Sequence, residues 1–312
     1  MTAEATATPA GIPAQRTRIA VVIPTYGREQ ILIDTIRMVL AQYPPADEVL
    51  IVDQSEDHEP DTVEFLSEHD RDGSIRWIRQ SPPNLPAARN RGLRETDCEV
   101  VLFLDDDVIL DDGLIGFHQS NYTLPHVEAV TGRLNGRRPR RKPPVGVIPQ
   151  RHLEFRYFDF DSPARRESVA ALCGGNHSIR RATTLEMGGY DENYLGWAFR
   201  EETDLALRLL RGGKQIVFDP RAGLLHLAAP SGGCRLSGFQ QMLRQWTVSF
   251  PAHYFCWKHL FPSRCFWQEL GESFRRSVLS RHNVLAPYRL APALISFAFS
   301  LVYSWWRWRQ CK

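Results

Sequence analysis

Five apolar residues run directly into three aspartates in the stretch Val100-Val101-Leu102-Phe103-Leu104-Asp105-Asp106-Asp107. A short, uninterrupted apolar run that stops at polar residues is typical of a strand buried on both faces of a parallel sheet. Adjacent carboxylates repel one another unless a cation or solvent compensates their charge. The stretch therefore predicts an α/β fold with a polar site at the end of this strand.

Two earlier apolar runs have the same form. Residues 19–23 stop at Pro24 and Thr25, and residues 49–52 stop at Asp53. Amphipathic helical patterns and an alternating stretch at 75–78 fill the intervals, which predicts a doubly wound, mostly parallel α/β sheet with helices on both faces. Ligands bind at the carboxyl ends of the strands in such sheets. We therefore expect these polar strand ends to meet at one edge.

The segment after the aspartates contains a basic stretch between regular elements. Residues 133–142 include six basic residues and no acid, so they form either a solvated loop or a clamp for a diphosphate or an anionic membrane. The predicted elements on either side are a helix at about 112–122, a strand at 127–131, a helix from Glu201 to Gly212-Gly213, and strands at 215–218 and 223–227.

The sequence pattern changes at about Gly232, and we expect a C-terminal helical region at 232–312. Aromatic side chains crowd between 246 and 267, interleaved with His, Lys and Arg, and residues 290–306 carry no charge. An uncharged run of 17 residues is at the lower limit for a membrane span, and Pro292 and several Ser and Tyr residues weaken that interpretation. An interfacial membrane anchor fits better, with a helix packed on the preceding domain as the open alternative.

Composition narrows the class of protein. The chain has 312 residues, of which 43% are hydrophobic and 24% charged, so it can hold two folding units and does not resemble a disordered or multi-span membrane protein. A net charge of +2 does not favour nucleic acid as a partner. Six cysteines without a C-x-x-C pair indicate a reducing compartment. We expect residues 1–17 to be a disordered tail rather than a signal peptide.

Six segments carry a family resemblance. In order, they are Val22-Ile23-Pro24-Thr25-Tyr26-Gly27-Arg28, Ile51-Val52-Asp53, Ala88-Arg89-Asn90-Arg91-Gly92, Leu104-Asp105-Asp106-Asp107, Gly174-Gly175-Asn176 and Glu201-Glu202-Thr203-Asp204-Leu205. Together they resemble the motif set of family 2 glycosyltransferases of the GT-A fold. The resemblance implies a catalytic domain at 18–231, with a nucleotide-binding half at 18–110 and an acceptor half at 111–231. It also implies an inverting, hexosyltransferase-like enzyme that moves a sugar from a nucleotide diphosphate donor to an acceptor hydroxyl.

The same resemblance assigns binding residues. Alternate residues of an extended chain point the same way, so Asp105 and Asp107 would face one site and, with His226, hold Mn²⁺ or Mg²⁺. Asp53 would accept a hydrogen bond from the ring of uracil or thymine, which favours UDP or TDP as the nucleotide. The full set implied for the nucleotide is Pro24, Thr25, Tyr26, Arg28, Asp53, Arg89 and Asp105, and that for the donor sugar is Gly174, Gly175 and Asn176.

The resemblance places the catalytic base at Glu202. In the family pattern the base is the Asp of a Glu-Asp pair, two residues before another Asp. Here Asp204 sets that register, so Glu202 replaces the usual Asp and Glu201 is the alternative base. Each assignment has a structural alternative: acids at a helix start are stabilised by the helix dipole, His226 can be structural, Arg89 can be a solvated helical residue, and Gly174-Gly175 can be a tight turn.

The expected partners follow from this activity. The acceptor would be a saccharide or a lipid-linked molecule in polysaccharide or glycolipid assembly. A membrane surface is a further expected partner, because aromatic and basic residues lie side by side in the C-terminal region, and we expect a cytoplasmic protein that lies peripherally on the inner face of the cell membrane. Two other classes remain open: a metal-dependent nucleotidyl or phosphoryl transferase, although the chain has no Walker loop, and a nucleotide-sugar sensor in which Glu202 has lost base function.

Overall fold

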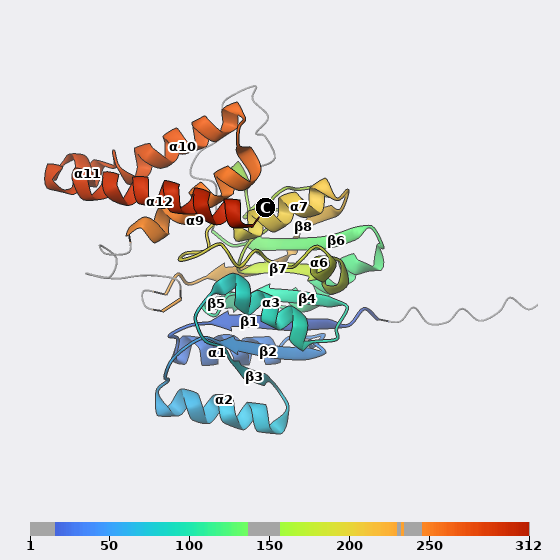
Figure 1. Ribbon diagram of the computed structural model, residues 1–312. Helices are drawn as coiled ribbons and strands as arrows, with labels where there is room; N and C mark the ends of the chain where they lie inside the picture. Colours follow the sequence, from blue (N-terminus) through green and yellow to red (C-terminus); the bar gives the residue numbers. More distant parts are fainter. Residues whose placement is uncertain (1–15, 137–156, 230–231, 234–244, 312) are drawn as a thin grey trace, which may run out of the picture.

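The computed structural model describes residues 16–136, 157–229, 232–233 and 245–311. Within these residues the strands form one sheet in the order β3-β2-β1-β4-β7-β6-β8-β5, with helices around it (Figure 1). The strands are β1 (Ile19–Thr25), β2 (Glu48–Asp53), β3 (Arg76–Arg79), β4 (Val100–Leu104), β5 (Val108–Leu110), β6 (Val127–Leu134), β7 (Asn176–Arg180) and β8 (Gln215–His226).

The N-terminal half follows the prediction from the sequence. β1 pairs in parallel with β2 and β4, and β2 pairs in parallel with β3. Every residue of β1 and β4 is buried, which confirms the interpretation of their apolar runs. The helices between the strands are α1 (Gln30–Leu40), α2 (Pro60–Asp72) and α3 (Leu85–Glu95). Because these strands are parallel, Thr25 lies beside Asp53 and the aspartates after β4 lie at the same edge.

The second half of the sheet mixes both strand directions. β7 runs antiparallel to β4 and β6, whereas β6 pairs in parallel with β8. The prediction of separate strands at 215–218 and 223–227 is wrong, because both belong to β8. Residues 220–222 form a bulge opposite the step from Gly132 to Arg133, so the hydrogen-bond ladder continues past Pro220.

The first residues of the basic segment belong to a strand. The predicted strand at 127–131 extends through Arg133 and Leu134 as β6, because β8 supplies backbone partners for both residues. Residues 137–142, which hold the other basic side chains, lie outside the described residues, as do residues 1–15 of the predicted tail. The predicted helix at 112–122 is α4 (Leu114–Ser120) followed by a 3-10 turn, η1 (Asn121–Thr123). After β7 come α6 (Arg181–Glu186) and α7 (Glu201–Arg211), which begins at the predicted Glu201.

The C-terminal region is helical and packs beside α7 (Figure 1). A second apolar cluster joins Tyr194, Ala198 and Leu207 to Phe250 and Phe255. Among the described helices, none has both the length and the apolarity needed to cross a bilayer. The elements are α9 (Gln245–Phe255), a π turn η2 (Cys256–Leu260), α10 (Arg264–Ser277), α11 (Arg281–Val284), a 3-10 turn η3 (Pro287–Arg289) and α12 (Leu290–Gln310).

Candidate functional site

A cavity of about 930 Å³ lies at the carboxyl ends of β1 and β4. Residues at these two strand ends form one part of its wall, together with His226 at the end of β8. Another part comes from residues 194–197, before α7, and from Trp246 and Thr247 of α9. Five predicted nucleotide-binding residues line this cavity: Pro24, Thr25, Tyr26, Arg28 and Asp105.

Asp105, Asp107 and His226 form the candidate metal centre. One ligand atom from each lies within 4.8 Å of the others. The His226 Nε2 atom is 3.3 Å from Asp105 Oδ2 and 3.2 Å from Asp107 Oδ1. Burial acts to raise the pKa of Asp105, but the hydrogen bond from His226 and the positive charge of Arg89 hold it below its ordinary value. Two carboxylates and one imidazole fit Mn²⁺ or Mg²⁺ by the chemistry of their donor atoms.

Asp106 points away from this centre, as the alternation predicted. Its carboxylate accepts a hydrogen bond from the Thr25 hydroxyl at 2.7 Å and pairs with Arg28 Nε at 3.1 Å. Burial and the neighbouring Asp105 and Asp107 charges raise the pKa of Asp106 to about 6, against the lowering effect of Arg28. Arg28 also binds Asp107 at 3.1 Å, so this buried guanidinium connects the segment after β1 to one residue of the candidate metal centre.

Asp53 and Arg89 do not line the cavity. The Asp53 carboxylate is fully buried and accepts hydrogen bonds, each at 2.9 Å, from the Ser55 amide and Trp77 Nε1, with His58 Nε2 at the same distance. Its neighbour Gln54 lines the cavity instead. The ends of β1 and β2 thus meet as predicted. The side chain of Asp53, however, contacts His58 and Trp77, and Trp77 belongs to β3.

Arg89 is buried, so its interpretation as a solvated helical residue is wrong. It forms an ion pair with Glu201 and donates a hydrogen bond to the Gly174 carbonyl at 2.8 Å. Glu201 is 1% exposed, whereas Glu202 is 9% exposed and lies beside Gly174. The structure therefore separates the two glutamates: the first is held by Arg89, and the second lies closer to the glycine pair.

The glycine pair lies against Asp105. A Cβ atom at Gly175 would collide with the Asp105 side chain, so this close approach of backbone and carboxylate requires glycine. Asn176 lies elsewhere: it is fully buried and donates hydrogen bonds to the Arg133 and Ala222 carbonyls, both at 3.0 Å. Its placement at the donor sugar stays a prediction.

The sequence interpretation gave no site role to several residues that line the cavity. Among them are Gln54, Tyr194, Trp197 and Trp246, although Asp53, the neighbour of Gln54, and the aromatic tract that begins at residue 246 were singled out. Gln54 follows a recognised strand end, so its position offered a signal. Trp246 lies more than 130 residues from the aspartates, and only its packing beside the 194–197 segment brings it to the cavity.

The Glycosyl transferase family 2 model matches residues 20–186, more than half of the chain. The chain belongs to glycosyl transferase family 2. A Bacillus subtilis (strain 168) protein named Probable glycosyltransferase YdaM is 25% identical over 221 residues, which cover 66% of this chain and 49% of that protein. The chain thus spans about half the length of this curated relative.

Two solved structures show that this family 2 chain has the GT-A fold. Mannosyltransferase PcManGT from Pyrobaculum calidifontis, in complex with GDP-Man and Mn²⁺, is similar with a TM-score of 0.56 at 16% identity, covering 94% of this chain and 77% of that one. The structure of GalNAc-T7 with UDP, GalNAc and Mn²⁺ has a TM-score of 0.53 at 15% identity, covering 83% and 54%. Glu201, Glu202, His226 and the C-terminal helices lie beyond the residues that the family model matches.

Proposed function

We propose that this family 2 chain transfers a sugar from a nucleotide diphosphate donor to an acceptor hydroxyl, with inversion at the anomeric carbon. The observation that carries this proposal is the cluster of Asp105, Asp107 and His226 at the wall of the large cavity. Both similar solved structures hold Mn²⁺, one with GDP-Man and the other with UDP. Mn²⁺ or Mg²⁺ at these residues would neutralise the charge of the leaving diphosphate.

The donor would lie along the strand ends. Pro24, Thr25 and Tyr26 of the cavity wall would contact the base, and Asp105 of the same wall would contact the ribose. The transferred sugar would lie near Gly174-Gly175, where no side chain separates the backbone from Asp105. A direct hydrogen bond from the uracil or thymine ring to Asp53 stays a prediction, and it would require this carboxylate to exchange one of its present partners, Ser55, Trp77 or His58. On that basis UDP or TDP remains the expected nucleotide.

Glu202 is our candidate for the base that takes the proton of the acceptor hydroxyl. Glu201 has its carboxylate bound to Arg89 and is almost fully enclosed. Glu202 follows it at the start of α7 and lies near Gly174, next to the glycine that contacts Asp105. The extra methylene of Glu, compared with the usual Asp, would set the proton-accepting oxygen further from the backbone of α7.

The acceptor would be lipid-linked and presented at a membrane surface, in polysaccharide or glycolipid assembly. Residues Ile295, Phe299, Val302 and Trp306, here called the α12 stripe, recur on one helical face and are 45–69% exposed. Trp246 of the cavity wall contacts Phe299 edge-to-face, with ring centroids 5.4 Å apart. The cavity therefore adjoins an exposed apolar surface, as an acceptor with a hydrocarbon chain requires.

The sequence around this surface carries positive charge, which would attract anionic lipid. No Asp or Glu follows Glu272 in the sequence, whereas basic residues continue to recur. An exposed apolar helical face beside basic side chains is typical of an interfacial helix, so we place the chain peripherally on the inner face of the cell membrane. The basic residues in the described part of this segment are Arg275, Arg276, Arg281, Arg289, Arg307 and Arg309.

One assay separates this function from the alternatives. The purified chain is incubated with Mn²⁺, labelled UDP-, TDP-, GDP- and CDP-sugars and a lipid extract, and the products are identified. We expect nucleoside diphosphate and glycosylated lipid from one donor class, and neither product in the presence of a chelator. Release of pyrophosphate would indicate a nucleotidyl transferase, and tight donor binding without any product would indicate a sensor; either result would overturn the proposal.

A further inference from the structure

The N-terminal turn of α7, which carries Glu202, is held on its outer side by the C-terminal region. Arg200 immediately precedes this turn and has a φ of 74°, a left-handed conformation that is strained for a side chain of this size. Its guanidinium is 1% exposed, binds Glu269 of α10 at 2.8 Å and lies over the Phe255 ring of α9, 4.5 Å from the centroid. The C-terminal helices therefore stabilise the backbone conformation from which α7 starts.

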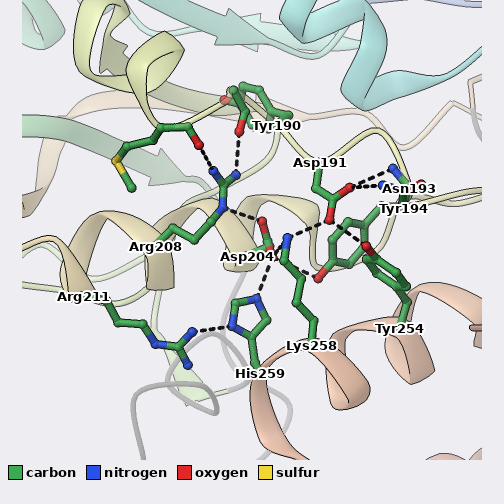
Figure 2. A network of polar contacts seen from close by, with 12 residues as sticks. Tyr190, Asp191, Asn193, Tyr194, Asp204, Arg208, Arg211, Tyr254, Lys258 and His259 are labelled. Atoms are coloured by element: carbon green, nitrogen blue, oxygen red, sulfur yellow. Dashed lines mark hydrogen bonds and ion pairs between the residues drawn. The ribbon is translucent and has the colours of Figure 1, made fainter. Parts of the chain in front are cut away.

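Asp204 provides a second attachment one turn further along α7 (Figure 2). Its buried carboxylate binds Lys258 Nζ at 2.7 Å and His259 Nε2 at 2.6 Å, both from η2, and Arg208 Nε at 2.8 Å from its own helix. Arg211 donates to His259 Nδ1 at 2.8 Å, so Nε2 carries the imidazole proton and donates to Asp204. Neutral His259 is consistent with its burial, which lowers its pKa.

Lys258 also fixes the segment before α7. Its ammonium group binds Asp191 Oδ2 at 2.6 Å, and Asp191 accepts a further hydrogen bond from the Tyr254 hydroxyl at 3.0 Å. Figure 2 shows Lys258 between the two aspartates, with Tyr194 of the cavity wall at the same junction. One cation from η2 thus bridges the start of the 191–197 segment and the first turn of α7.

We propose that Glu269, Lys258 and His259 are positioning residues, which act through Arg200 and Asp204 to set the place of Glu202 relative to the donor. The inference rests on the proposed role of Glu202 as base and deepens it. A displacement of about 1 Å at a reacting group can cost on the order of 10²-fold in rate. These contacts are therefore expected to affect kcat more than donor binding, because Asp105 and Asp107 directly follow β4 and His226 ends β8, and none of the three takes part in these contacts.

The test compares two glutamates of α10. Glu269→Gln removes the negative charge that pairs with Arg200, whereas Glu272→Gln is the matched control, because Glu272 binds Arg275 and Arg276 of its own helix. For each variant we would measure kcat, the KM for the donor, the pH profile of kcat, the Kd of the nucleoside diphosphate with Mn²⁺, and Tm. We expect Glu269→Gln and Lys258→Met to lower kcat by about 10-fold or more and to shift the acid limb of the pH profile, with Kd and KM within about twofold of wild type.

An unchanged kcat and pH profile in Glu269→Gln, with only Tm lowered, would overturn the proposal and leave these contacts a purely structural role. If Glu269→Gln no longer binds the diphosphate, Lys258→Met decides, because it breaks the contact with Asp204 and leaves the pair of Arg200 and Glu269 intact. Wild-type kcat and an unchanged pH profile in Lys258→Met would then overturn the proposal. Glu202→Gln is assayed in parallel: full transfer by this variant would show that the base assignment itself is wrong, whatever Glu269 does.

Discussion

Two groups of buried or half-buried aspartates differ in how their charge is compensated. Among the described contacts, the three aspartates at 105–107 share one guanidinium, that of Arg28, and the imidazole of His226. Asp191, which precedes α7, and Asp204, in the first turn of α7, are matched by Lys258 and Arg208 and by a hydrogen bond from His259. The side chain of Asp105 is 35% exposed, whereas that of Asp204 is fully buried.

This difference shows how the same residue type serves two purposes. Where the protein supplies fewer cations than carboxylates at the wall of a cavity, an external divalent cation has a place to bind. Where the protein supplies matching cations, the carboxylates join separate parts of the chain and have no capacity left for a metal. Residual charge and exposure, more than the presence of acidic residues, therefore distinguish a candidate binding site from a structural junction.

The largest expected effect is the loss of cation-dependent binding in Asp107→Ala. Removing this ligand leaves the diphosphate charge uncompensated, so Mn²⁺ should no longer enhance binding of the nucleoside diphosphate. Calorimetric titration with and without Mn²⁺ measures the effect. Asp191→Asn is the matched variant from the other group, which should keep the enhancement and lose stability instead. Equal enhancement in wild type and Asp107→Ala would remove the metal assignment.

A second effect separates the two glutamates at the start of α7. We expect Glu202→Gln to lose transfer by about 10²-fold or more while it keeps donor affinity, which is the usual scale for loss of a general base. Glu201→Gln leaves Arg89 without its ion-pair partner, so its main expected effect is a lower free energy of unfolding. Initial rates and donor titrations check both variants. Retained transfer in Glu202→Gln together with lost transfer in Glu201→Gln would move the base by one position.

A third prediction concerns the exposed face of the C-terminal region, which carries the α12 stripe. The opposite face of this region packs beside α7. The double change Ile295→Asp and Val302→Asp puts two charges on the α12 stripe and should weaken binding to anionic vesicles by about tenfold or more. Val63→Asp on α2 is the control, because Val63 is also an exposed apolar side chain. Vesicle sedimentation at low and high salt measures both, and high salt should release part of the wild type. Wild type that stays in the supernatant at low salt would contradict membrane docking.

The smallest expected effect is on the pH dependence of stability through His253, which lies inside the C-terminal region. Burial lowers its pKa from 6.5 to about 4, and it contacts the hydroxyls of Ser300 and Ser273. Because the unfolded chain takes up a proton below pH 6.5 and the folded chain does not, stability falls as the pH decreases from about 6.5 towards 4.

His253→Gln removes this titration. The free energy of unfolding should then fall less between pH 7.5 and 5.5 than it does in wild type, by about 1 kcal/mol. Urea unfolding at the two pH values measures the difference. An identical decrease in both proteins would show that His253 does not titrate differently in the folded and unfolded chain.

The strand ends of the N-terminal half could be predicted from the sequence because their signals are local. An apolar run of five residues that stops at Asp105 defines both a buried strand and its end, and the parallel connection brings that end beside Thr25. Alternation along the extended chain also separated Asp106 from Asp105 and Asp107, and the structure confirms it. These features depend on residues that are close in sequence or on general rules of sheet topology.

Which side chains contact one another over long sequence separations was decided only by the tertiary structure. The sequence shows an Arg at 200 and a Glu at 269, but no periodicity pairs them, and only the fold brings Glu269 of α10 into contact with the residue that precedes α7. In the same way, Asp53 ends a strand as predicted, yet the side chains of His58 and Trp77 enclose it. The physical reason is that the charge and exposure of a side chain depend on all elements packed around it, whereas strand and helix signals depend mainly on neighbours along the chain.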